Sequence, residues 1–157
     1  MRTGYELFFD ISALVKIYHD EEGADTVLEI YNSEGQITIA ELAKIEFYST
    51  IYRKYRERVI DLETLNLLIE KFDFDVENKY EILFFSTGIT EQAQNLLRQH
   101  GETLGIRSLD SLQLSFFDFY CDKDEDTFVC WDTRLTKLAE EKNFKVLLAT
   151  GGKKVIS

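Results

Sequence analysis

Three aspartates stand where apolar runs give way to sequence of helical period, and their carboxylates are well suited to chemistry. Asp10 follows Leu7-Phe8-Phe9, Asp132 follows Phe128-Val129-Cys130-Trp131, and Asp110 lies in the first turn of a helical segment. Each alone has a structural explanation, because an aspartate at a helix N-terminus satisfies free backbone N–H groups and favours the helix dipole. Together they favour a ligand site, because open parallel sheets bind ligands beyond the carboxyl ends of their strands.

A fourth carboxylate, Glu46, lies in the middle of a predicted helix, where no cap role explains it. At about 100° per residue, Glu41 and Glu46 differ by roughly 140° around that helix, so only one of them can face the site. Glu46 shares its side with Leu42, Ile45 and the small Ser49, whereas Glu41 occupies the first turn. We therefore choose Glu46 as the fourth ligand.

Four oxygen donors without histidine or thiolate suit Mg²⁺ or Mn²⁺ rather than zinc. The two histidines, His19 and His100, are far apart, and Cys121 and Cys130 form no close pair, so a disulfide framework or a metal–thiolate site is not expected. Without cations, four converging carboxylates would repel one another, and one or more should hold a proton at neutral pH. One or two divalent ions could bind a phosphodiester and activate water for an in-line displacement.

The charge balance restricts the kinds of partner. The chain of 157 residues has 18 basic and 29 acidic residues and a net charge of −11, which argues against affinity built on a broad basic surface. It does not argue against a metal-dependent nuclease, because bound cations are the largest local charges at such a site. A local basic patch or a partner protein would have to supply the remaining positive charge. We expect a cytoplasmic protein without a membrane span, because apolar runs are short and an acidic residue interrupts the N-terminus.

The elements that must position these residues alternate between short apolar strands and longer helices. This alternation predicts a single α/β domain over residues 1–150, a three-layer α/β/α sandwich around a central parallel sheet, with residues 151–157 as a C-terminal tail. We expect the acidic run 122–126 to be a solvated turn. The expected strands are 7–9, 36–39, 80–85, 127–131 and 145–148, and the expected helices are 12–31, 40–56, 61–77, 90–100, 108–120 and 133–142.

Four segments together resemble the PIN-domain family, and within it the VapC-like toxins of bacteria and archaea. They follow the family's order and spacing from the first strand to the last helix, and Ser12 also matches. The chain departs from the family pattern at Ile11, where threonine is usual, and at Ser111-Leu112-Gln113, where Ala-Leu-His is common; either change could alter substrate fit. The segments are Phe8 to Tyr18, Ile45 to Arg53, Leu109 to Leu114 and Val129 to Leu135.

The resemblance implies a ribonuclease that depends on one or two Mg²⁺ or Mn²⁺ ions. Asp10 and Asp110 would be the central ligands, completed by Glu46 and Asp132, and all four would be catalytic. Ser12 and Thr133 are candidates for a supporting role behind the ligands, and a helix-cap role is the alternative for each. Lys16, Arg107 and Arg134 could contact substrate phosphates. Each of them could equally be a solvated or ion-paired charge on the surface.

The same resemblance implies a homodimer held inactive by a small antitoxin protein, as the toxin of a type II toxin–antitoxin pair. The aromatic helix surface around Phe47, Tyr48, Ile51, Tyr52 and Tyr55 could serve as core, dimer face or antitoxin groove, with core as the default. The alternative is a non-catalytic PIN-like binding or regulatory module. An aspartate-based phosphohydrolase is disfavoured, because Ser12 and Ala13 supply no second acid near Asp10.

Overall fold

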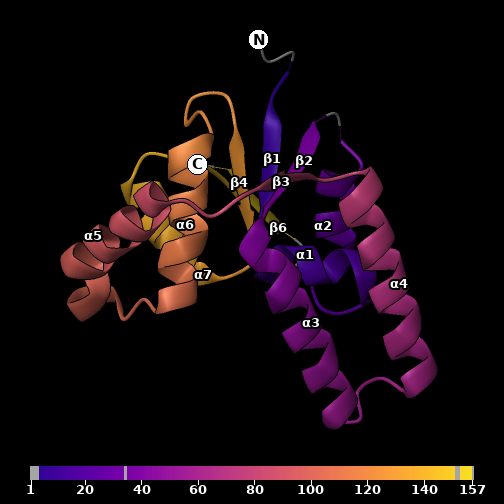
Figure 1. Ribbon diagram of the computed structural model, residues 1–157. Helices are drawn as coiled ribbons and strands as arrows, with labels where there is room; N and C mark the ends of the chain where they lie inside the picture. The colour runs from indigo at the N-terminus through magenta and orange to yellow at the C-terminus, as the bar shows by residue number, and fades with distance from the viewer. Residues whose placement is uncertain (1–3, 34, 151–152, 157) are drawn as a thin grey trace.

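A computed structural model describes residues 4–33, 35–150 and 153–156 of the chain. Strands and helices alternate along most of it, as the sequence predicts (Figure 1). No helix in these ranges is both long and apolar enough to cross a membrane. The elements are β1 (Glu6–Phe9), α1 (Ile11–Tyr18), α2 (Ala24–Tyr31), β2 (Gln36–Ala40), α3 (Glu41–Arg56), α4 (Leu62–Asn78), β3 (Glu81–Leu83), α5 (Thr87–Leu104), α6 (Ser108–Tyr120), β4 (Thr127–Cys130), α7 (Thr133–Glu141), β5 (Lys145–Thr150) and β6 (Lys153–Ile156).

The sheet runs in the order β3-β2-β1-β4-β5-β6, and its first five strands are parallel. This confirms the predicted α/β class with a central parallel sheet. β1 and β4 are neighbours, with Phe9 opposite Val129, and the Asp10 N–H donates to the Val129 carbonyl at 3.1 Å. The segments that leave these two strands therefore start side by side at the same edge of the sheet.

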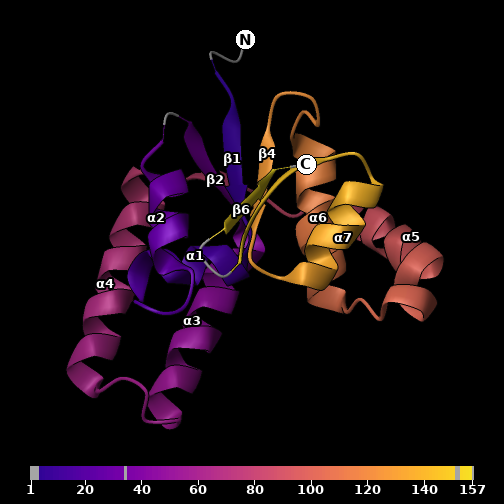
Figure 2. The same ribbon diagram turned by 180° about the vertical axis from the view of Figure 1, so that it is seen from behind.

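Side chains alternate between the two faces of β1, and each face is covered by helices (Figures 1 and 2). Leu7 and Phe9 belong to a core cluster formed with α1 to α4. Phe8 belongs to the other cluster, which α5, α6 and α7 cover. Because both faces are buried, the strands are apolar almost throughout, as is usual in parallel sheets.

The tail is the clearest departure from the expected chain organisation. Of residues 151–157, which were expected to form a tail, 153–156 form β6, which pairs antiparallel with β5. Residues 151, 152 and 157 lie outside the described ranges. The sequence signal was weak because a four-residue strand at the sheet edge carries little periodicity of its own.

The segment expected as one helix over 12–31 is two helices. α1 ends at Tyr18 and α2 begins after Gly23, which has φ of +89° in the left-handed region. A Cβ at Gly23 would lie 2.3 Å from the ring of Trp131. The helix therefore breaks where the backbone turns closely around this aromatic ring, a tertiary contact that the periodicity of the segment does not reveal.

Helices α3 and α4 form a hairpin that extends past the carboxyl ends of the strands (Figure 1). Phe47 of α3 stacks on Phe72 of α4 with ring centroids 3.9 Å apart. Phe47 and Ile51 are fully buried, as the core interpretation expects, but Tyr48 and Tyr52 are exposed. The aromatic surface of α3 is thus divided between the core and solvent.

The amino ends of β1 and β4 are joined by a buried carboxylate. Asp126 is 0% exposed and accepts hydrogen bonds from the N–H groups of Glu6 and Asp122 at 2.8 and 2.7 Å. The acidic run 122–126 was expected to be a solvated turn, and this is wrong for Asp126. Its carboxylate binds backbone donors that the turn would otherwise bury without partners.

Candidate active site

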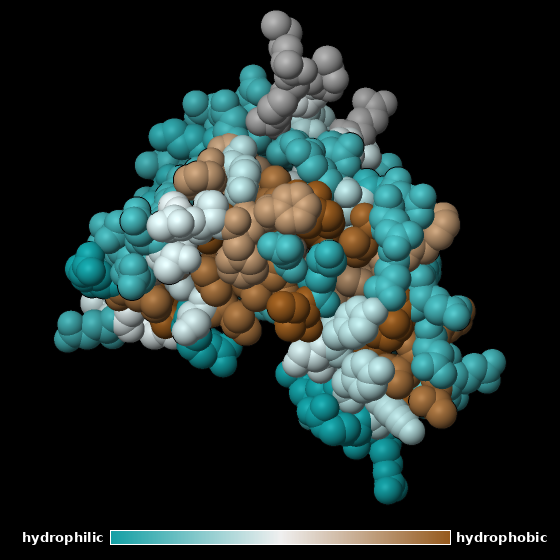
Figure 3. All heavy atoms as spheres, in the orientation of Figure 1, coloured by the Kyte–Doolittle hydropathy of each residue, from teal (hydrophilic) through white to brown (hydrophobic). Residues whose placement is uncertain are grey.

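The four carboxylates predicted as ligands line one cavity of about 710 Å³ at the carboxyl ends of β1 and β4. Asp10 begins the turn into α1, Asp132 begins the turn into α7, Glu46 lies on α3, and Asp110 lies in the first turn of α6. In Figure 3 the surface is hollowed on the lower side, between the α3–α4 hairpin and the group of helices α5, α6 and α7. Four segments that are far apart in the sequence therefore meet at one site.

Asp10 is held by contacts from both strands. It is 2% exposed, and its Oδ1 accepts hydrogen bonds from the Ala13 N–H at 3.1 Å and the Ser12 hydroxyl at 2.7 Å. The Ser12 Oγ in turn accepts from the Trp131 N–H at 2.9 Å, and the Cys130 thiol lies 3.5 Å from Asp10 Oδ2. Ser12 thus fixes the carboxylate relative to β4. Burial raises the pKa of Asp10 to about 6 against these hydrogen bonds.

Glu46 is buried on α3 and contacts a residue that the sequence analysis did not assign to the site. Burial, with smaller effects from the charges of Asp10 and Asp110, raises the pKa of Glu46 to about 7. The Gln113 side-chain amide donates a hydrogen bond to Glu46 Oε1, and Gln113 is 2% exposed. Gln113 stands three residues after Asp110, one turn along the same side of α6, and this spacing is the signal that could have identified it.

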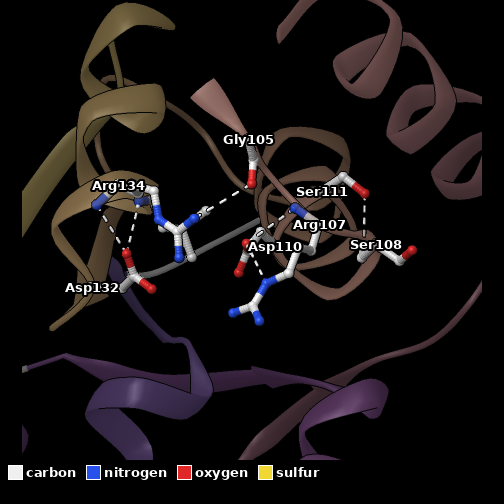
Figure 4. Close-up of polar contacts among 8 residues, drawn as sticks. Gly105, Arg107, Ser108, Asp110, Ser111, Asp132 and Arg134 are labelled. Carbon is white, nitrogen blue, oxygen red and sulfur yellow. Dashed lines mark hydrogen bonds and ion pairs between the residues drawn. The ribbon is translucent and has the colours of Figure 1, made fainter. Parts of the chain in front are cut away.

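Asp110 and Asp132 both bind backbone N–H groups at helix N-termini (Figure 4). Asp110 Oδ2 accepts from the Arg107 N–H at 3.2 Å and lies 3.9 Å from Arg107 Nε. Asp132 Oδ1 accepts from the N–H groups of Arg134 and Leu135 at 2.9 and 3.1 Å. Both aspartates therefore bind free backbone N–H groups at the start of a helix, as the structural explanation expects. These hydrogen bonds use one oxygen of each carboxylate.

The other predicted residues divide between the cavity and the surface. Lys16 and Arg107 line the cavity, whereas Thr133 and Arg134 are exposed and are not among its lining residues. The Arg134 guanidinium lies 3.4 Å from the Gly105 carbonyl (Figure 4). Polar and aromatic lining residues that the sequence analysis did not assign include Glu21, Thr50, Arg53, Lys54 and Trp131.

Lys16 is held in place by an acidic and an aromatic neighbour. It is 6% exposed, its Nζ lies 4.9 Å from the ring centroid of Trp131, and it lies 3.7 Å from Glu21 Oε2. Lys54 from α3 lies at the same distance from this Glu21 oxygen. The two lysines thus share one carboxylate at the wall of the cavity, and much of their charge is already paired.

The donor set fits a hard divalent cation in chemistry, since the four carboxylates offer only oxygen. Their spacing is looser than in a closed metal site: no three of the four have oxygens that all lie within 4.8 Å of one another. In the described part of the chain such a group is formed by Glu6, Cys121 and Asp126, at the amino ends of the strands. There the Asp126 carboxylate binds backbone N–H groups, so this group has a structural explanation.

The cavity differs in charge from the molecule as a whole. Five acidic and four basic residues line it, although the chain has a net charge of −11. The basic residues are Lys16, Arg53, Lys54 and Arg107. The cavity is therefore nearly balanced, and a bound divalent cation would make it net positive.

Comparisons with known proteins identify the family and the fold. The model of the PIN domain matches residues 7–118. No curated protein matches the sequence. Among solved structures, the Mycobacterium tuberculosis toxin VapC20, described as cleaving the sarcin–ricin loop, superposes with a TM-score of 0.66 at 12% identity, covering 84% of this chain and 94% of that one.

Two further solved structures share the fold. FitAcB from Neisseria gonorrhoeae has a TM-score of 0.63 at 14% identity and covers 89% of this chain and 95% of that one. VapBC2 from Rickettsia felis, bound to a DNA fragment from its promoter, has a TM-score of 0.61 at 17% identity. The match covers 89% of this chain and 96% of that one. The family match spans most of the chain and includes three of the four carboxylates, so the chain belongs to the PIN-domain family and has the fold of VapC-type toxins.

Proposed function

We propose that this chain is a divalent-metal-dependent ribonuclease and the toxin of a type II toxin–antitoxin pair. The observation that carries the proposal is the set of four carboxylates from four separate segments that line one cavity in a PIN-domain chain. PIN-domain membership supports a nuclease in general. Dependence on metal is supported by the donor chemistry, and RNA as the substrate is supported by the fold shared with a toxin described as cleaving the sarcin–ricin loop.

Asp10, Glu46, Asp110 and Asp132 would hold one or two Mg²⁺ or Mn²⁺ ions. Asp10 and Asp110 would be the central ligands. Asp110 and Asp132 each bind backbone donors through one oxygen, which leaves the other oxygen for a cation or its water. When bound, such an ion lowers the pKa of water and stabilises charge on the phosphate oxygens.

The remaining residues would orient ligands and neutralise substrate charge. The Ser12 hydroxyl donates to Asp10 Oδ1 and so restricts the direction of the other oxygen, and the Gln113 amide does the same for Glu46. Lys16 and Arg107 line the cavity and would contact phosphates there. Thr133 and Arg134 are exposed outside the lining, so a role for them would require movement of α7 or of the substrate.

A protein partner is part of the proposal. Solved structures with this fold include a toxin–antitoxin complex from Klebsiella pneumoniae, with a TM-score of 0.55 at 13% identity over 82% of this chain and 88% of that one. We infer by analogy that a small antitoxin inserts a basic side chain into the acidic end of the cavity, and that the toxin acts in the cytoplasm as a homodimer. If a short reading frame lies beside the gene, its co-expression with the chain, followed by affinity purification, tests for this partner, and the absence of such a frame would favour a nuclease without an antitoxin.

The catalytic part is tested by comparing RNA cleavage by the wild type and Asp10→Asn in Mg²⁺, in Mn²⁺ and in EDTA. We expect cleavage by the wild type with either ion, loss of at least about 100-fold in the variant, and no cleavage in chelator. Arg56→Gln is a control, since Arg56 is exposed and does not line the cavity. Cleavage that persists in Asp10→Asn or in EDTA would rule out this mechanism.

The loose spacing of the carboxylates favours one alternative, a non-catalytic PIN-like module that binds a partner. Titration with Mn²⁺ in a calorimeter separates the two. A ribonuclease of the proposed kind binds Mn²⁺, and Glu46→Gln weakens that binding. A chain that binds no Mn²⁺ and cuts no RNA fits the alternative.

A further inference from the structure

One face of α3 lines the cavity well beyond the four carboxylates. The lining residues recur at intervals of one, three and four, which places them on a single side of the helix. At about 1.5 Å per residue this face is roughly 18 Å long from Leu42 to Lys54. The cavity is therefore an elongated groove, and its α3 wall consists of Leu42, Ile45, Glu46, Ser49, Thr50, Arg53 and Lys54.

The chemistry of this wall changes along its length. Glu46 lies with the carboxylates, Ser49 and Thr50 place hydroxyl-bearing side chains one turn further, and Arg53 and Lys54 follow after another turn. A phosphodiester strand with a cation at its reactive phosphate needs hydrogen-bond donors and positive charge at the phosphates that flank it. The α3 wall offers these groups in that order.

Arg53 differs from Lys54 in the availability of its charge. Lys54 lies 3.7 Å from Glu21, an oxygen that it shares with Lys16. Arg53 is exposed, and no acidic side chain within the described ranges forms an ion pair with it. Its guanidinium can form a bidentate contact with a phosphate, which an ammonium cannot.

We propose that the α3 face from Ser49 to Arg53 is a phosphate subsite for single-stranded RNA, with Arg53 as its main contact; this rests on the proposed ribonuclease function. Arg53 lies about 10 Å along the helix from Glu46, and a stacked strand carries a phosphate roughly every 3.4 Å, so the contacted phosphate lies within about three nucleotides of the cleaved bond. The cavity of about 710 Å³ has the size of a small-molecule pocket. It therefore accommodates a few nucleotides of one strand rather than a duplex.

Stabilisation of the helix end does not explain the position of Arg53 by itself. Arg53, Lys54 and Arg56 all lie in the last turn of α3, where positive charge interacts favourably with the helix dipole. Arg53 and Lys54 line the cavity, whereas Arg56 is exposed and does not. Arg56 is therefore a matched control, with the same charge and in the same turn but outside the cavity lining.

The test uses a single-stranded RNA oligonucleotide that the wild-type chain cleaves, and variants of it with one phosphate replaced by a neutral methylphosphonate. In the wild type we expect one position within about three nucleotides of the cleaved bond to lower kcat/KM by roughly 5- to 20-fold. Arg53→Gln should lose a similar factor on unmodified RNA, mainly through KM, and lose nothing more at that position. Arg56→Gln should behave as the wild type, and unchanged thermal unfolding and Mn²⁺ binding should show that both variants are folded.

The outcomes separate this inference from the function on which it rests. If the wild type cleaves the RNA but Arg53→Gln has an unchanged KM, the subsite is wrong and the ribonuclease stands. The same conclusion follows if Arg53→Gln keeps the methylphosphonate effect, or if Arg56→Gln loses as much as Arg53→Gln. If the wild type cleaves no RNA, both the function and the subsite are wrong.

Discussion

Asp10 and Glu46 differ from the other two site carboxylates in being almost fully buried. They are 2% and 8% exposed, and burial raises the pKa of Asp10 to about 6 and that of Glu46 to about 7. We expected the site to hold protons at neutral pH without cations, and these raised pKa values support that expectation. Burial raises both pKa values more than repulsion between the carboxylates does.

These pKa values predict how stability without cations depends on pH. The folded chain binds these two protons more tightly than the unfolded chain, so the stability that they contribute is fully present below the ordinary pKa values near 4 and is lost as pH rises through 6 to 7. Glu46→Gln removes one such group and should raise the free energy of unfolding at pH 7.5 by up to about 3 kcal/mol, with a smaller gain at pH 5. Urea unfolding in EDTA at the two pH values measures this.

Glu70→Gln is the control for the pH prediction. Glu70 is exposed in the middle of α4 and does not line the cavity, so its replacement should change stability about equally at both pH values. If Glu46→Gln also gives the same change at pH 5 and pH 7.5, burial does not control the protonation of Glu46.

Residue types and spacing identified the four carboxylates but not their neighbours. Asp10, Asp110 and Asp132 could be found because each begins a helix after an apolar or turn segment, and Glu46 because no cap role explained it. Gln113 could have been found from its spacing to Asp110, but its partner Glu46 lies 67 positions away. Trp131 could not be assigned, since its contact with Ser12 joins residues 119 positions apart. Such contacts depend on how the helices pack against the sheet, which periodicity alone does not determine.

Among the elements, the turn between α1 and α2 has the strictest backbone requirement near the site. Gly23 has φ of +89°, and a Cβ there would overlap the Trp131 ring, over which Lys16 also lies. Gly23→Ala should therefore destabilise the chain by about 1–3 kcal/mol through backbone strain and displacement of the ring. Thermal or urea unfolding measures the loss, and tryptophan fluorescence reports the movement of Trp131, the only tryptophan in the chain.

Gly101→Ala is the matched control, because Gly101 lies inside α5 and a Cβ there would have no neighbour within 4 Å. It should stabilise the chain by about 0.5–1 kcal/mol through helix propensity. Equal effects of the two replacements would mean that the contact with Trp131 does not constrain the turn.

Element types were more predictable than element ends. The five parallel strands and the helices between them follow from apolar periodicity. The expected strand over 80–85 is only Glu81–Leu83, and the expected helix over 90–100 extends over Thr87–Leu104. With no proline in the chain, these boundaries depend on caps and tertiary contacts, which leave a weaker trace in sequence.

At the scale of the whole molecule, net charge and site charge have opposite consequences for binding RNA. The chain as a whole repels a polyanion, whereas four basic residues gather in the cavity. Two of them, Lys16 and Lys54, are already paired with Glu21. The substrate should therefore release few counterions when it binds.

This predicts a shallow dependence of cleavage on salt. For a single strand the slope of log affinity against log salt is about −0.7 per phosphate neutralised, so we expect a slope of roughly −1 to −3 for kcat/KM between about 50 and 200 mM salt. Rates at subsaturating RNA and fixed Mg²⁺ give this slope. A slope of about −6 or steeper would mean that basic residues outside the cavity bind the RNA.

The antiparallel strand β6 has a consequence for unwanted strand pairing at the edge of the sheet. An unpaired sheet edge offers its backbone donors and acceptors to any extended segment, and long flat edges promote aggregation. β6 pairs with β5 along Leu147–Thr150, and the opposite edge strand, β3, is only three residues long. Without β6, the six-residue strand β5 would become an open edge. β6 thus replaces a six-residue edge strand with one of four residues, which offers a shorter template for pairing.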